Sequence, residues 1–172
     1  MTQHGPGADV VRTLYDYNYW AHRQVWACIA QLTDAQFARD FDWSHGSIHA
    51  QVVHTMGAEW IWFERLRGRW PRAMLAPADY PTRDAVRARW DEIEADVRAY
   101  LATLDDAQLV ENLHYRSTKG DAHVNVMWEI LLHVVNHGTD HRAQIMAALN
   151  QMGAPTVEQD FIFFLRARGG GS

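Results

Sequence analysis

Apolar residues recur at spacings of three and four along four long segments of the chain, which is the pattern of amphipathic helices. In the first segment the apolar face comprises Leu14, Tyr17, Ala21, Val25, Cys28 and Leu32. The second, at about residues 48–67, is apolar almost all round, and Gly68 and Pro71 follow it as helix-ending residues. Between these two segments, residues 41–47 are of the types found in loops and at helix N-termini.

Two further long helices are predicted at about residues 82–104 and 126–152. Thr82 can cap the first of them, and Gly153 and Pro155 end the second. Residues 105–125 are predicted to be a polar connection without strands, and residues 157–166 to be a short last helix. These elements predict an all-α fold, a four-helix bundle with a short additional C-terminal helix.

The length of 172 residues suits one domain, and a composition that is 48% apolar is that of a globular protein. We expect a single helical-bundle domain at residues 1–168. The last four residues, Gly-Gly-Gly-Ser, are predicted to be a flexible tail.

Charge and composition exclude several classes of function. The formal net charge is −5 and basic residues are interspersed with acidic ones, whereas a nucleic-acid binder normally shows a basic patch. No run approaches the roughly 18 apolar residues of a membrane span. The single cysteine, Cys28, excludes an internal disulfide framework, and no secretory signal pattern is visible. We therefore expect a cytoplasmic protein that binds neither nucleic acid nor membrane.

Candidate chemistry lies among the ten histidines. His137 and His141 are one helical turn apart at the border of an apolar stripe, so both imidazoles can bind one ion at the usual 2.0–2.1 Å for zinc. His133 turns further from the stripe, and His45 and His49 straddle a helix start. Spacing alone leaves an alternative, in which His137 and His141 are partly buried histidines with ordinary hydrogen bonds.

His54 is the candidate for a third ligand. It shares a helix sector with Ala50, Gly57 and Ala58, whose small side chains would leave space beside a metal. They would equally suit a histidine buried for packing reasons. Three protein ligands with an open position are the arrangement of a catalytic metal, whereas a structural site is closed by four.

The sequence resembles the DinB-like (DinB/YfiT) family over nearly its whole length. The matching pieces are Tyr17-Asn18-Tyr19-Trp20-Ala21-His22, Gly46-Ser47-Ile48, Val53-His54, the run of residues 58–66, the run of residues 132–145 and Gln159-Asp160-Phe161-Ile162. The resemblance implies that His54, His137 and His141 are the metal ligands. The chain departs from the commonest family pattern at Asp140 and Ala143, and neither change removes a ligand.

Residues next to these ligands have expected supporting roles. Arg142 is expected to pair with Glu59 or Asp160 and to tie helices together. Asn136 is expected to orient a helix end or a ligand imidazole. No side chain stands out as a general base, for which Glu59 and Asp140 are the candidates.

The cofactor is expected to be a divalent metal ion, zinc or nickel in preference to iron, copper or manganese. The resemblance implies a metal-dependent S-transferase or isomerase that uses a low-molecular-weight thiol of the bacillithiol, mycothiol or glutathione type, or a related hydrolase. The alternative is a non-catalytic metal- or ligand-binding bundle of the stress response. By the same resemblance the protein is expected to be a homodimer.

Overall fold

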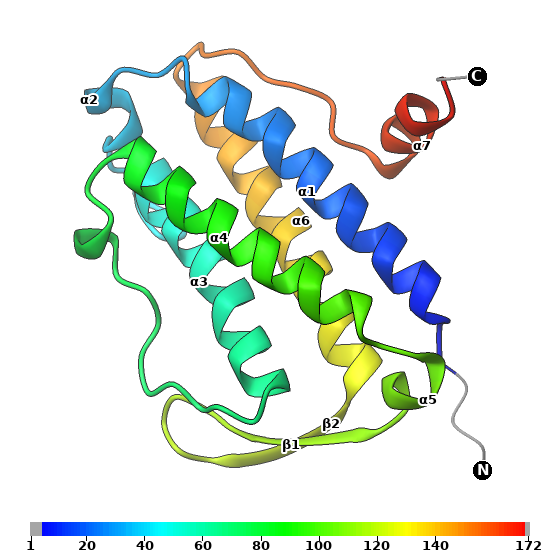
Figure 1. Cartoon of the computed structure of the whole chain (residues 1–172). Helices are drawn as coiled ribbons and strands as arrows, with labels where there is room; N and C mark the ends of the chain where they lie inside the picture. Colours follow the sequence, from blue (N-terminus) through cyan, green and yellow to red (C-terminus); the bar gives the residue numbers. More distant parts are fainter. Residues whose placement is uncertain (1–4, 171–172) are drawn as a thin grey trace.

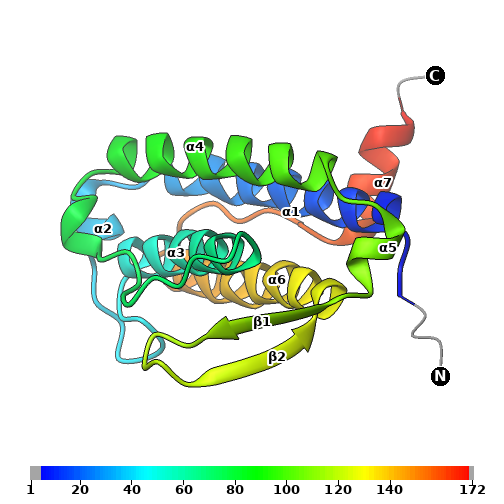
Figure 2. The same cartoon turned by 60° about the horizontal axis from the view of Figure 1, so that its bottom comes forward.

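A computed structural model gives the structure of residues 5–170. Four long helices form a bundle: α1 (Ala8–Ile29), α3 (Ile48–Leu66), α4 (Arg83–Ala102) and α6 (Met127–Gln151). Helix α1 packs against α6 and α4, and α3 packs against the same two helices (Figure 1). Figure 2 shows the two layers that result, α1 with α4 and α3 with α6. The predicted four-helix bundle is therefore confirmed.

The connection between α3 and α4 gives the bundle its topology. It carries the chain back along α3 through the short 3-10 helix η1 (Pro77–Asp79), so that α3 and α4 run in the same direction (Figure 1). A Cβ placed on Gly57 of α3 would lie 3.3 Å from Leu75 Cβ, which shows how closely the connection covers that helix. The small residues of α3 thus accommodate the connecting chain.

Hydrogen-bonding side chains fix where the helices begin. Ser47 Oγ accepts from the backbone N–H of Ala50 at the start of α3, and Thr82 Oγ1 accepts from that of Ala85 at the start of α4. These contacts satisfy backbone donors that have no partner within the helix. The short helix α2 (Asp34–Phe37) begins with a reciprocal capping box at Thr33. The cap predicted at Thr82 is confirmed.

The prediction that residues 105–125 lack strands is wrong. After the short helix α5 (Asp106–Leu109), β1 (Asn112–Arg116) pairs antiparallel with β2 (Ala122–Val126) in a hairpin. Both strands alternate apolar and polar residues, but each has only five residues, and most of β2 is exposed, so the pattern is too short to stand out within a polar connection.

The C-terminal helix also differs from its prediction. Helix α7 (Phe161–Gly169) begins after an extended segment that follows Pro155, four residues later than expected. Gly169 is in its last turn and Gly170 is its C-cap, so these two residues do not belong to a free tail. The rest of the predicted tail, residues 171–172, lies outside the described residues.

None of the helices in residues 5–170 combines the length and hydropathy that a bilayer crossing requires.

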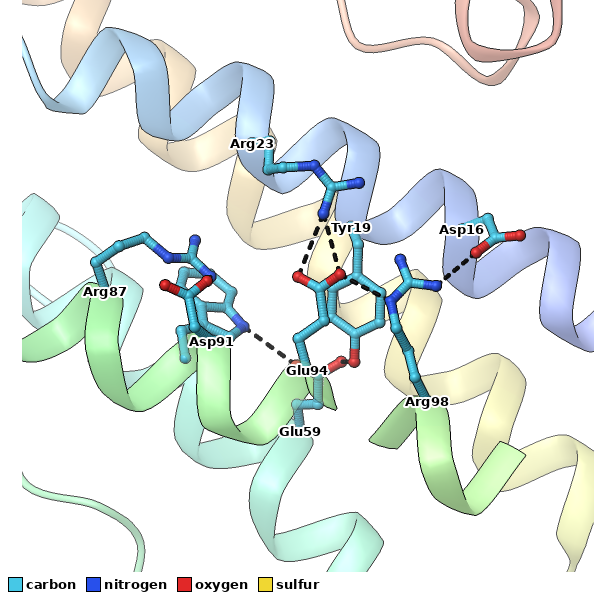
Figure 3. Close-up of polar contacts among 9 residues, drawn as sticks. Asp16, Tyr19, Arg23, Glu59, Arg87, Asp91, Glu94 and Arg98 are labelled. Atoms are coloured by element: carbon cyan, nitrogen blue, oxygen red, sulfur yellow. Dashed lines mark hydrogen bonds and ion pairs between the residues drawn. The ribbon is translucent and has the colours of Figure 1, made fainter. Parts of the chain in front are cut away.

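A buried carboxyl group joins three helices of the bundle. Glu59 of α3 accepts hydrogen bonds from Tyr19 OH of α1 at 2.8 Å and from Trp90 Nε1 of α4 at 3.1 Å. Burial raises the pKa of Glu59 to about 7. Around this group, exposed ion pairs such as Arg23–Glu94 connect α1 with α4 (Figure 3). Exposed pairs contribute at most about 1 kcal/mol each, so the buried contacts matter more here.

Helices α1 and α6 approach each other at Gly138, beside a fully buried arginine. Arg142 donates to Asn18 Oδ1 at 2.6 Å, to Gln159 Oε1 at 2.7 Å and to Thr139 Oγ1 at 2.9 Å. Arg142 therefore ties helices together as expected, but its partners are neutral groups. The predicted pairing with Glu59 or Asp160 is wrong, since the guanidinium makes no ion pair among the described residues.

We predict that Gly138→Ala destabilises the fold. The added Cβ would lie 2.7 Å from Asn18 Oδ1 and 3.1 Å from Arg142 Nη1, so it would push apart a buried hydrogen-bonded pair. Overpacking typically costs about 1–3 kcal/mol, which exceeds the gain of up to about 1 kcal/mol in helix propensity. Urea unfolding should show a net loss of roughly 1–2 kcal/mol. Gly169→Ala, where a Cβ meets nothing within 4 Å, is the control and should lose no stability.

We also predict that Glu59 makes stability depend on pH. Its pKa is raised in the folded chain, so the folded state holds a proton between pH 4.5 and about 7 that the unfolded state releases. Relative to Glu59→Gln, which mimics the protonated carboxyl, the free energy of unfolding of the wild type should therefore fall as pH rises from 5 to 8, by up to about 3 kcal/mol. The comparison is needed because the buried histidines, whose pKa values are lowered, make the stability of both proteins rise with pH over part of this range. Denaturant titrations measure this difference, and a difference that is the same at pH 5 and pH 8 would contradict the assignment.

Candidate metal centre

The three predicted ligands come together between α3 and α6. His54 lies in α3, and His137 and His141 lie one turn apart in α6. His137 Nε2 is 3.2 Å from His54 Nε2 and 3.0 Å from His141 Nε2. Two nitrogens bound to one zinc ion at 2.0–2.1 Å with a tetrahedral angle lie about 3.3 Å apart. These two spacings fit ligands of one ion, and the rings of His54 and His141 are close as well, with centroids 4.7 Å apart.

A glutamine behind the site fixes the orientation of His141. Gln51 is buried in α3, and its Oε1 accepts from His141 Nδ1 at 2.8 Å. The amide nitrogen of Gln51 donates to Ser44 Oγ at 2.6 Å and to Gln144 Oε1 at 2.8 Å, which sets the direction of the amide. The proton of His141 therefore sits on Nδ1, and the lone pair of Nε2 faces His54 and His137.

The hydrogen-bond inventory of this cluster favours a cation. A neutral imidazole carries one N–H, so His137 Nε2 can donate to either His54 or His141 but not to both. The pair His54–His137 and the pair His137–His141 therefore cannot both be hydrogen bonds. In at least one of them two nitrogen atoms lie close together without a shared proton. A divalent ion would satisfy all three nitrogens together, so the donor set suits a metal such as zinc or nickel.

Burial keeps these ligands uncharged at neutral pH. Desolvation lowers the pKa of His54, His137 and His141 from 6.5 to about 4, and neighbouring imidazoles act in the same direction. Only unprotonated imidazoles bind metal. The three rings are therefore in the protonation state that an ion requires.

A fourth histidine, which the sequence analysis set aside, adjoins this cluster. His45, His54 and His141 each offer a ring nitrogen within 4.8 Å of the other two, so these three could also hold a metal ion. The His45 ring is stacked on that of His54, with centroids 3.8 Å apart. Two overlapping sets of three histidines thus share His54 and His141. His45 precedes the helix by several residues, so helical periodicity could not place it.

A small cavity of about 280 Å³ lies beside His133, one helical turn along α6 from His137. It is lined by Trp62, Tyr115, Asn125, Glu129, Ile130 and His133. Trp62 also lines a narrow internal space that His137 borders, and the ring of His133 is 5.8 Å from that of His137. The hairpin that the sequence did not reveal supplies Tyr115 and Asn125 to this wall. The cavity is large enough for part of a small molecule.

The other predicted site residues make no hydrogen bond to a ligand imidazole within residues 5–170, although Asp140 interacts electrostatically with His137 and His141 and Glu59 borders the same narrow space as His137. Glu59 is engaged with Tyr19 and Trp90, and Asp140 is exposed and accepts from Gln144 Nε2. Asn136 is exposed too, and the structure gives no hydrogen bond between it and a ligand histidine within residues 5–170. The residue that supports a ligand is Gln51, which lies one helical turn before His54.

We predict that Gln51→Leu weakens metal binding without abolishing it. The change removes the acceptor that holds His141 Nδ1–H, while all the histidines remain. Loss of such a supporting group typically costs 10–100-fold in metal affinity, so zinc competition against a chelator should show about that decrease. Gln31→Leu is the control, because Gln31 is an exposed glutamine just after α1 with only a local hydrogen bond. Equal affinities in the two variants would contradict the role of Gln51.

Comparison with known proteins places the chain in a family. The profile described as DinB family matches residues 1–170. The chain is 26% identical over 163 residues to "Protein DinB" of Bacillus subtilis (strain 168), covering 92% of this chain and 95% of that protein.

Two solved structures have the same fold. One is a DinB-like protein from Bacillus cereus ATCC 10987, with a TM-score of 0.55 and 16% identity, covering 81% of this chain and 92% of that one. The other is YfiT from Bacillus subtilis, with a TM-score of 0.58 and 17% identity, covering 89% and 93%. YfiT is described as a probable metal-dependent hydrolase with an unusual four-helix bundle topology. The sequence match and the bundle agree: this chain belongs to the DinB family.

Proposed function

We propose that this protein is a metal-dependent enzyme in which His54, His137 and His141 hold a divalent ion and a low-molecular-weight thiol is transferred to a small electrophile. The observation that carries the proposal is the convergence of three uncharged imidazoles, with Nε2 atoms 3.0 and 3.2 Å apart, one helical turn from a cavity. The description of YfiT as a probable metal-dependent hydrolase supports the metal but names another reaction.

Three neutral ligands leave the charge of a divalent ion uncompensated, and such an ion lowers the pKa of a thiol or water that it binds. The side chains of the protein would orient the ligand histidines and the substrate and would exclude water. Gln51 holds His141, and Trp62 and Tyr115 form an aromatic wall in which their rings meet edge-on at 5.1 Å. An apolar wall of this kind suits the carbon skeleton of a small substrate.

The carboxylates nearest the three imidazoles have hydrogen-bond partners of their own, as Asp140 does in Gln144 Nε2, which favours a thiol over water as the nucleophile. Glu59 faces Tyr19 and Trp90, and Glu129, at the cavity wall, accepts from the backbone N–H of Val126. A thiol has a pKa near 8.5 and needs little help to ionise, whereas hydrolysis usually requires a base for water and an acid for the leaving group. In the proposed transfer the thiol releases its proton, its sulfur bonds to carbon, and the leaving group departs with the electron pair of the broken bond.

We predict that the purified wild type binds roughly one zinc or nickel ion per chain and that His54→Ala, His137→Ala and His141→Ala each lose it. Elemental analysis after dialysis measures this, with circular dichroism to confirm the helical fold. Zinc at about 100 times its dissociation constant should also stabilise the wild type by about 2.7 kcal/mol and leave the variants unchanged. The control His114→Ala removes an exposed histidine of β1 and should retain the metal.

Visible absorption of the cobalt-substituted protein tests the thiol. Addition of a low-molecular-weight thiol should produce a sulfur-to-cobalt charge-transfer band and shift the ligand-field bands. A spectrum that does not respond to thiols would favour the non-catalytic metal- or ligand-binding bundle. Turnover of an ester or amide without any thiol would favour hydrolysis.

The homodimer and the cytoplasmic location stay predictions.

A further inference from the structure

His45 is the one member of the histidine cluster that the proposed site does not use. It lies in the loop between α2 and α3 and is exposed, whereas His54 and His141 are half-buried and buried. Its ring is stacked on that of His54 with an angle of 24° between the planes, and its centroid is 5.4 Å from that of His141. An exposed side chain has many alternative conformations, so its place against the imidazoles of His54 and His141 requires an explanation.

The loop is built so that residue 45 faces the cluster. Ser44 has a φ of 55°, a left-handed conformation that costs a non-glycine residue roughly 1–2 kcal/mol, and Gly46 has a φ of 83°. The Gly46 carbonyl accepts from Phe41 N–H at 2.9 Å, and the Gly46 N–H donates to the Trp43 carbonyl at 3.1 Å. These contacts form a tight turn on either side of His45.

The same turn is anchored to the residues that orient a ligand. Ser44 Oγ donates to Gln144 Oε1 of α6 and accepts from Gln51 Nε2 of α3 at 2.6 Å. Gln51 in turn holds His141. The residue before His45 is thus hydrogen-bonded to the two helices that carry the predicted ligands, and the position of the loop is coupled to the position of the site.

The distances place His45 within reach of an ion. Its nitrogen lies within 4.8 Å of ring nitrogens of both His54 and His141. Ligands of a tetrahedral zinc ion lie about 3.3 Å apart, so a movement of at most about 1.5 Å would bring the exposed imidazole to ligand spacing from His54 and His141. None of the other described histidines forms such a group with the cluster; His133, the nearest along α6, lines the adjacent cavity instead.

Resting on the metal site proposed above, we propose that His45 is a fourth, exchangeable nitrogen ligand of the ion held by His54, His137 and His141. His45 is exposed and belongs to a loop, whereas the other three ligands are fixed by helices. The resting protein therefore has a closed set of four imidazoles, and an external ligand must compete with His45 for the ion.

Four variants test this inference: His45→Ala, His45→Phe, His137→Ala and the surface control His114→Ala. His45→Phe keeps a ring that can stack on His54 but has no nitrogen. Zinc affinity is measured by competition with a chromophoric chelator, and the cobalt-substituted proteins are titrated with azide. Each readout reports on the ion without any assay of activity.

We expect both His45 variants to keep the ion but to bind it at least about tenfold more weakly than the wild type and His114→Ala do. Loss of a group that only supports a ligand already costs about this much, so loss of a ligand should cost no less. Their cobalt spectra should change, and azide should bind them more tightly than it binds the wild type. His137→Ala should lose the ion.

Four results would overturn the inference. His45→Ala that matches His114→Ala in affinity and spectrum would show that His45 is only a surface ring; in that case the three-histidine site stands. Wild-type affinity in His45→Phe would assign the effect to stacking. Loss of metal from His45→Ala with retention in His137→Ala would replace the proposed triad by His45, His54 and His141. A wild type that binds no metal would end both proposals.

Discussion

The hydrogen bonds of the Gln51 side chain hold α3 and α6 in the register on which the site depends. The amide contacts His141 and Gln144 on one helix and Ser44 in the loop, while its own helix carries His54 one turn later. A shift of one helix by a single residue would turn its side chains by about 100° and separate the imidazoles. The candidate metal centre therefore depends on how the helices pack, and the buried amide of Gln51 links α3, α6 and the loop before α3.

The rest of the bundle supplies the buried polar contacts that make this register unique. Glu59 joins α1, α3 and α4, and Arg142 joins α6 to α1 and to the segment before α7. A buried polar group that loses its partner costs about 1–3 kcal/mol, and a charged one more, so alternative packings that break these contacts are unfavourable. Apolar contacts alone would tolerate more sliding between helices. The structure thus combines an apolar core with a few polar links that specify one arrangement.

Helical periodicity predicted the parts of the fold that are long and amphipathic, and the cap at Thr82 follows from the same local chemistry. The hairpin was not predicted because β1 and β2 are short and largely exposed, and their few apolar residues pack on the bundle rather than on each other. Of the site, the spacing of His137 and His141 is visible on one helix, but the contact with His54 is a tertiary one that the family resemblance alone implied. His45 and Gln51 could not be found from the sequence, because a turn with a left-handed Ser44 and a buried amide leave no periodic signal.

X-ray absorption at the edge of the bound metal identifies the ligands themselves in the intact protein. For zinc held by histidines we expect a first shell of nitrogen at about 2.0–2.1 Å, with the outer-shell scattering of at least three imidazole rings. Four rings in the wild type would agree with ligation by His45, and three with the site of His54, His137 and His141 alone. A first shell made of oxygen, without imidazole scattering, would show that histidines do not bind the metal.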